Sequence, residues 1–80
     1  MKRTYELVTN TRKTNRMLLS ELTRQLRNAH YSVEVLQGTH YYQGFFYSTI
    51  TVSHSVGNER PIIDEVTSFI GGRITVILEK

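Results

Sequence analysis

The sequence predicts a single α+β domain, residues 1–80, whose elements follow in the order β-α-β-β-α-β. Three observations support this prediction. Apolar residues recur at helical spacing in two segments, and four other segments alternate in polarity or are rich in β-branched and aromatic residues. Turn and cap residues separate these segments. The composition, 39% hydrophobic and 21% charged, is typical of a folded globular protein.

The N-terminal part of the chain predicts a short strand and a long helix. Residues 4–8 alternate, with Tyr5 and Leu7 on one face of the strand. The other face carries Thr4, Glu6 and Val8. Turn and cap residues occupy positions 9–11, and a helix is predicted over about residues 12–30. Its apolar stripe consists of Leu18, Leu22, Leu26 and Ala29.

The middle of the chain predicts a strand, a loop and a longer strand. Residues 32–37 alternate as a strand, and residues 38–44 are expected to form a loop between two glycines. A strand from Phe45 to about Val56 follows, and it is longer than the preceding strand can pair. The set expected to face the core is Phe46, Ser48, Ile50, Val52, His54 and Val56. The alternate set is expected on an exposed sheet face, with Phe45 and Tyr47 at one end.

The C-terminal part predicts a second helix and a last strand. Pro61 suits the first turn of the helix, and the pair at 71–72, both glycine, suits its end. The stripe expected to be buried consists of Ile62, Val66 and Phe69, assisted by Ile63 and Ile70. Residues 73–79 form the last strand, and those expected to point inward are Ile74, Val76 and Leu78.

This order of elements predicts a ferredoxin-like sandwich. With right-handed crossovers, each β-α-β half places its helix on the same side of one antiparallel sheet. Two helices then cover one face of the sheet, and the other face is left open. An α+β domain with a different strand order is the structural alternative.

The composition also restricts the class of protein. Cysteine is absent, which excludes disulfides, thiolate metal sites and cysteine nucleophiles. A secreted domain of this size usually needs such cross-links, so an intracellular setting is favoured. The N-terminus lacks the apolar stretch of a signal peptide, and no apolar run approaches the length that spans a bilayer. We therefore expect a soluble, cytoplasmic protein with no membrane partner.

The positive charge is concentrated in the first part of the chain. The net charge is +3, but residues 1–30 carry seven Lys and Arg against two acids (+5), whereas residues 31–80 carry three against five (−2). This asymmetry indicates a side that faces a polyanion, although a solvated helix face is the alternative. The residues predicted to bind nucleic acid are Arg12, Lys13, Arg16, Arg24 and Arg27 on the helix, and Phe45 and Tyr47 on the sheet.

Part of the long strand resembles a known motif. In the segment 43–50, Gly44, Phe45 and the aromatic Tyr47 are similar to the third-strand motif of RNA-recognition domains. The leading basic residue and the terminal aromatic of that motif are missing. The first strand also departs from the family, because its outward positions carry no aromatic and Glu6 would repel phosphate. The resemblance implies aromatic side chains that stack on bases.

No residue pattern predicts catalysis. His30, His40 and His54 lie on different predicted elements, without the spacing of a metal site. No serine has the context of a nucleophile elbow, and the glycine-rich anion loop of acylphosphatases, which share the predicted fold, is absent. We expect a protein that is not an enzyme, with no metal and no cofactor.

Two functions follow from this sequence. The leading hypothesis is a small nucleic-acid-binding regulator that contacts phosphates through the first helix. In the predicted fold, however, the helix face and the open sheet face point in opposite directions, so one ligand cannot easily engage both. The alternative is a protein-binding adaptor or inhibitor, of the kind that phages and mobile elements encode, acting through a homodimer or an exposed strand edge.

Overall fold

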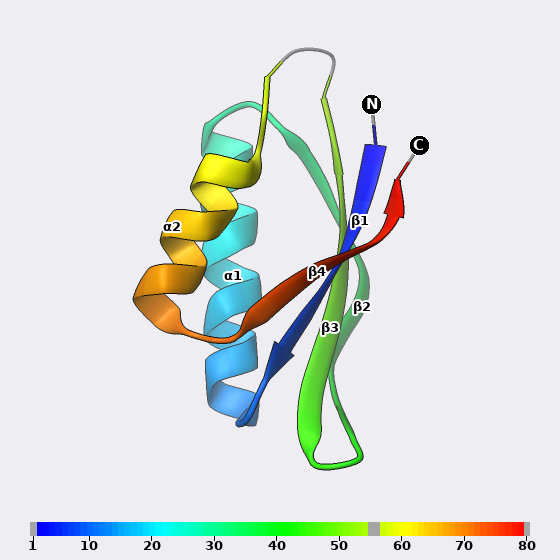
Figure 1. Cartoon of the computed structure of the whole chain (residues 1–80). Helices are drawn as coiled ribbons and strands as arrows, with labels where there is room; N and C mark the ends of the chain where they lie inside the picture. Colours follow the sequence, from blue (N-terminus) through cyan, green and yellow to red (C-terminus); the bar gives the residue numbers. More distant parts are fainter. Residues whose placement is uncertain (1, 55–56, 80) are drawn as a thin grey trace.

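The computed structural model describes residues 2–54 and 57–79, within which there are four strands and two helices (Figure 1). The strands are β1 (Lys2–Thr9), β2 (Ser32–Tyr42), β3 (Phe45–Ser53) and β4 (Arg73–Glu79), and the helices are α1 (Arg12–Asn28) and α2 (Arg60–Ile70). This order is the predicted one. Ser55 and Val56, predicted to end the third strand, lie outside the described residues.

The strands form one antiparallel sheet in the order β2-β3-β1-β4. Figure 1 shows both helices on the same side of this sheet, with the opposite face open. The predicted ferredoxin-like arrangement is therefore confirmed. It follows from the two right-handed crossovers, because each crossover returns its helix to the same face.

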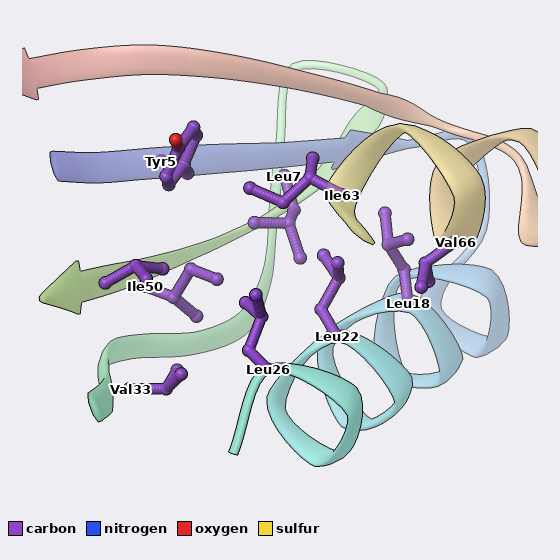
Figure 2. Packing of buried hydrophobic residues seen from close by; sticks show 10 residues of the cluster. Tyr5, Leu7, Leu18, Leu22, Leu26, Val33, Ile50, Ile63 and Val66 are labelled. Carbon is purple, nitrogen blue, oxygen red and sulfur yellow. The ribbon is translucent and has the colours of Figure 1, made fainter. Parts of the chain in front are cut away.

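The core lies between α1 and the two central strands. Figure 2 shows Leu18, Leu22 and Leu26 of α1 directed at the sheet, where Tyr5 and Leu7 of β1 meet them. The remaining buried apolar residues are Val33, Ile50, Val52, Ile63 and Val66. The predicted inward faces of β1 and the middle of β3 are confirmed, as are Leu18, Leu22 and Leu26 of the predicted helix stripe, because alternation and helical spacing are local properties of the chain. Ala29, the fourth residue of that stripe, is exposed, because α1 ends before it.

Helix α1 begins at a threonine cap. The backbone of Thr11 is extended (φ −131°, ψ 154°), and its side chain accepts a hydrogen bond from the backbone N–H of Thr14 at 3.1 Å. The helix ends at Asn28, before the predicted end at His30, because His30 has a φ of 70°. Neither helix, among the described residues, is long and apolar enough to cross a membrane.

The prediction of a loop at 38–44 is wrong. Strand β2 continues to Tyr42 and pairs along most of β3, so the expected spare pairing capacity of the long strand does not exist. The chain reverses instead at Gln43 and Gly44, whose φ values of 47° and 92° form a tight two-residue hairpin turn. Gly38 lies within the strand, where the β2–β3 pairing shifts register between Gln37 and His40.

Two predictions about inward-facing residues are also wrong. Phe69 is 91% exposed, because α2 turns Ile63, Val66 and Ile70 toward the core and Phe69 lies about 100° away around the helix. Leu78 is displaced by a β-bulge. Leu78 pairs with Thr4 and Val76 with Tyr5, so Ile77 is an extra residue, and Leu78 falls on the open face of the sheet.

Candidate nucleic-acid interface

The five predicted cations all lie exposed on α1. Among the described residues, no carboxylate lies within salt-bridge distance of Arg12, Lys13 or Arg16. These three cations occupy the first half of the helix, where the free N–H groups of the helix terminus also attract anions. The N-terminal half of α1 is thus a surface of positive charge that no carboxylate of residues 2–54 and 57–78 neutralises by an ion pair.

The two other predicted cations are already engaged. Arg24 forms an ion pair with Glu21, and its Nε donates to Glu21 Oε2 at 3.3 Å. The hydrogen bonds of this pair raise the pKa of Arg24 and, together with Gln25, lower the pKa of Glu21. Arg27 donates from Nη2 to the carbonyl oxygen of Val33 at 2.9 Å. We call the five cations together the basic ridge of α1; Arg24 and Arg27 extend it but are less available than the first three.

Aromatic side chains at the end of the β2–β3 hairpin lie next to the start of α1. The guanidinium carbon of Arg12 is 5.1 Å from the ring centroid of Phe46, which is within cation–π distance. The ring of Tyr41 meets Phe46 edge-on at 5.2 Å and remains 60% exposed. Figure 1 shows why: the hairpin extends past the first turn of α1. We call Arg12, Lys13, Arg16, Tyr41 and Phe46 the basic–aromatic surface.

A buried amide fixes the hairpin against the helix. Asn15 is fully buried, and its Nδ2 donates to the carbonyl oxygens of Leu7 at 3.2 Å and Phe46 at 3.0 Å. Its Oδ1 accepts a hydrogen bond from Thr39 Oγ1 at 2.9 Å. The side chain of Asn15 therefore forms hydrogen bonds to β1, β2 and β3. These bonds fix the hairpin that carries Tyr41 against the helix that carries Arg12.

A shallow hollow lies between the basic ridge and β2. It has a volume of about 360 Å³ and is lined by Arg12, Arg16, Leu19, Ser20 and Thr39. Two guanidinium groups and two hydroxyl groups at one depression are donors suited to phosphate oxygens.

The predicted pair Phe45 and Tyr47 lies on the other face of the sheet. Tyr47 pairs with Val8 of β1 and His40 of β2, whereas its neighbour Phe46 pairs with Thr9 and faces the helices. The ring of Tyr47 stacks on His40 at 5.9 Å and meets Tyr42 at 6.4 Å. The structure therefore separates the predicted aromatic pair from the predicted cations and brings Tyr41 and Phe46 to the cations instead.

The residues predicted to bind nucleic acid do not include Tyr41, because the sequence analysis placed residue 41 in a loop beside the open sheet face. The alternation of β2 through the hairpin turn was the available signal, since Tyr41 pairs with Phe46 across the turn. Asn15, which occupies a position on the apolar side of α1, was also missed. A polar residue amid an apolar stripe signals a buried hydrogen-bonding role.

The opposite end of the molecule holds a buried polar cluster that the sequence did not indicate. Glu59 precedes α2 and is fully buried, and Tyr5 donates to its Oε2 at 2.6 Å. Arg3 lies 3.3 Å from both carboxylate oxygens, and His54 Nε2 is 2.9 Å from Oε1. This cluster ties the start of α2 to β1 and to the end of β3.

Burial and its partners shift the pKa values within this cluster in opposite directions. Burial opposes ionisation of Glu59, but hydrogen bonds from Tyr5, the backbone and Arg3 outweigh it and lower the pKa of the carboxyl group. Burial, together with the hydrogen bond to Glu59 and its charge, raises the pKa of Tyr5 to about 12. Among the described residues, no three His, Asp or Glu side chains group in a way that could hold a metal ion.

Comparison with known proteins adds information on the fold alone. No protein-family model and no curated protein sequence matches this chain. The chain is similar to a solved structure described as "De novo designed protein Foldit4", with a TM-score of 0.56 and 12% identity over 99% of this chain and 97% of that chain. The structural similarity supports the shared α+β architecture, but at this low sequence identity it carries no functional assignment.

Proposed function

We propose that this protein binds single-stranded nucleic acid through the basic–aromatic surface. The observation that carries the proposal is the position of an exposed tyrosine, Tyr41, whose ring contacts Phe46, the residue over which Arg12 lies. Arg12 and Arg16 have no carboxylate partner among the described residues. A flat ring next to cations is the arrangement that proteins use to hold a base and its phosphates together.

The cations and the tyrosine of this surface make different contributions to the free energy of binding. The cations supply an attraction to phosphate that does not depend on sequence and weakens as salt rises. Tyr41 supplies stacking, worth about 1–3 kcal/mol per base. Phe46 has Arg12 over its ring, so it supports the arginine, whereas the more exposed Tyr41 receives the base. Unpaired bases are needed for this contact, which favours a single strand over a duplex.

The matched pair Tyr41 and Tyr42 tests the stacking contact. The two residues are neighbours on β2 and equally exposed, at 60% and 59%, but they lie on opposite faces of the sheet. Fluorescence anisotropy with a labelled single strand of about 12 nucleotides measures the affinity. We expect Tyr41→Ser to weaken binding about tenfold, which corresponds to about 1.4 kcal/mol. Tyr42→Ser serves as the control and should change little.

A salt titration tests the electrostatic contact. Replacing both Arg12 and Arg16 with Gln should reduce the slope of log affinity against log salt by about 1.4, because each phosphate contact to a single strand contributes about 0.7. Arg60→Gln is the matched control, since Arg60 is already paired with Asp64 on α2. The proposal fails if the unmodified protein shows no affinity at low salt.

A double variant, Phe45→Ser/Tyr47→Ser, tests the open face of the sheet. A larger loss of affinity in this variant than in Tyr41→Ser would move the binding site to the open face.

A second candidate function, association with another protein, is favoured by one observation. Strand β4 lies at the edge of the sheet and exposes three consecutive apolar residues, Val76, Ile77 and Leu78, at 37%, 50% and 50%. Apolar side chains on an unprotected edge favour pairing with an added strand.

A further inference from the structure

We infer that β4 is the contact surface of a homodimer, in which the β4 strands of two copies pair antiparallel and join the two sheets. This inference deepens the protein-association function and does not depend on nucleic-acid binding. It rests on the edge position of β4, on the apolar residues that this edge exposes, and on the arrangement of charge along the strand.

Within the described part of the chain, the backbone of β4 has a strand partner on one side only. It pairs with β1 through Arg3↔Glu79 to Val8↔Arg73, and β4 is the last strand in the order β2-β3-β1-β4. The groups on its outer side are therefore available to another strand. Residues 74–78 are uncharged and include no proline, so two of the devices that block edge pairing do not occur in this stretch, whose one irregularity is the bulge at Ile77. The bulge at Ile77 brings apolar side chains, not a charge, to the surface.

The exposed residues of β4 lie on both faces of the strand. Val76 is opposite Tyr5 on the helix side, yet it is 37% exposed, so the helix layer does not cover this edge. Leu78 is opposite Thr4 on the open face and is 50% exposed. A strand that is added at this edge would cover apolar surface on both sides, which a monomer leaves in contact with water.

The charge pattern of β4 favours a second copy over another strand. The strand reads Arg-Ile-Thr-Val-Ile-Leu-Glu from Arg73 to Glu79, with a cationic residue first and an acidic residue last. Antiparallel pairing of two copies centred on Val76 places position 73 of each strand, an arginine, opposite position 79 of the other, a glutamate, and it places Ile74 opposite Leu78. Opposite charges across a strand pair stabilise it, and this match arises twice because the contact is two-fold symmetric.

The other edge of the sheet is less suited to such a contact. Strand β2 carries Glu34 in its first half, and its pairing with β3 shifts register twice, between Val35 and Gln37 and between Gln37 and His40. Such irregularities bend an edge away from a flat partner strand, and β2 has two of them where β4 has one, at Ile77. The basic–aromatic surface also lies at this side of the molecule, over β2 and β3. A dimer through β4 therefore leaves both copies of that surface free, at opposite ends of a joined eight-stranded sheet.

Cross-linking tests the pairing directly, because the chain contains no cysteine. In the proposed register the two Val76 residues face each other, with Cα atoms about 4.5–5.5 Å apart, a separation that a disulfide can bridge. We expect Val76→Cys to form a disulfide-linked dimer under mild oxidation. Leu36→Cys is the matched control on the other edge, where Leu36 is 52% exposed, and it should cross-link much more slowly. Equal cross-linking rates for the two variants would overturn the inference.

Sedimentation velocity tests the dimer independently of the register. We expect the unmodified protein to sediment at twice the mass of its 9.3 kDa chain. Ile77→Lys should shift it to the monomer, while Leu36→Lys should leave the dimer intact, with circular dichroism as the check that both variants fold. A monomer at all concentrations in the unmodified protein would refute the inference. Oligonucleotide binding by a monomeric Ile77→Lys protein would show that the two proposals stand or fall separately.

Discussion

Replacement of Glu59 by glutamine is the most informative perturbation of the fold. The carboxylate is fully buried and accepts hydrogen bonds from Tyr5 at 2.6 Å and from Arg3 at 3.3 Å, with His54 Nε2 at 2.9 Å. Glutamine keeps the shape of the side chain but removes the negative charge. Its amide NH₂ group also turns donor hydrogens toward partners that are themselves donors. The substitution therefore removes the negative charge that faces Arg3 at this site.

The expected loss of stability follows from the burial of the two charged partners. Removal of one member of a buried ion pair costs about 3–5 kcal/mol, and Arg3 is 22% exposed, which places the effect near the lower end. We therefore expect Glu59→Gln to lower the free energy of unfolding by about 3 kcal/mol. A domain of this size has a total stability of roughly 4–12 kcal/mol, so the variant should remain folded but with a lower midpoint.

Urea denaturation at pH 7, followed by circular dichroism, measures this loss. Glu34→Gln, an exposed carboxylate on β2, is the control and should change stability by less than about 0.5 kcal/mol. The pH dependence gives a second readout. Because the pKa of Glu59 is lowered in the folded state, its contribution is complete above the unfolded-state value near 4.5 and is lost as the pH falls through the folded-state value.

The difference between the unmodified protein and Glu59→Gln should accordingly shrink as the pH is lowered from 7 to 3. A stability loss below about 1 kcal/mol at pH 7 would refute the reasoning. A loss that stays constant down to pH 3 would refute it equally, because the ionised carboxylate would then not be the stabilising group.

Three further predictions concern other residues. Subtraction of the ultraviolet pH titration of Tyr5→Phe from that of the unmodified protein should reveal one tyrosine ionisation near pH 12. The stability that Tyr5 contributes should be lost as the pH rises from the unfolded-state pKa near 10 to the folded-state pKa of about 12. An ionisation midpoint near pH 10 would argue against the buried hydrogen bond. Asn15→Leu removes the contacts to three strands and takes this donor away from two carbonyl oxygens. The free energy of unfolding should fall by about 2 kcal/mol and hydrogen exchange should show faster opening of the β2–β3 hairpin, whereas unchanged protection would contradict this role. Phe69→Ser should change the free energy of unfolding by less than about 0.5 kcal/mol, because the ring is 91% exposed. A larger loss of stability in a thermal melt would indicate that Phe69 is covered.

The candidate interface was partly predictable from the sequence. The cations of α1 were found because helical spacing places them on one side, away from Leu18 and Leu22, and this depends only on the helix. The aromatic partner was not found, because Tyr41 reaches Arg12 only through the hairpin, between residues far apart in the sequence. Phe45 and Tyr47 were correctly placed on the open face, and the predicted fold already put that face on the side of the sheet opposite α1.

The sequence by itself determined the order of elements, the apolar faces of α1, β1 and β3, and through these the ferredoxin-like sandwich. These features depend on alternation and on turn residues, which are properties of neighbouring positions. The tertiary structure decided which polar residues are buried, how far β2 extends and which face Leu78 occupies. Glu59 illustrates the reason: Tyr5 and Arg3 stabilise its buried charge from more than 50 positions away in the chain, and only the folded sheet brings them together.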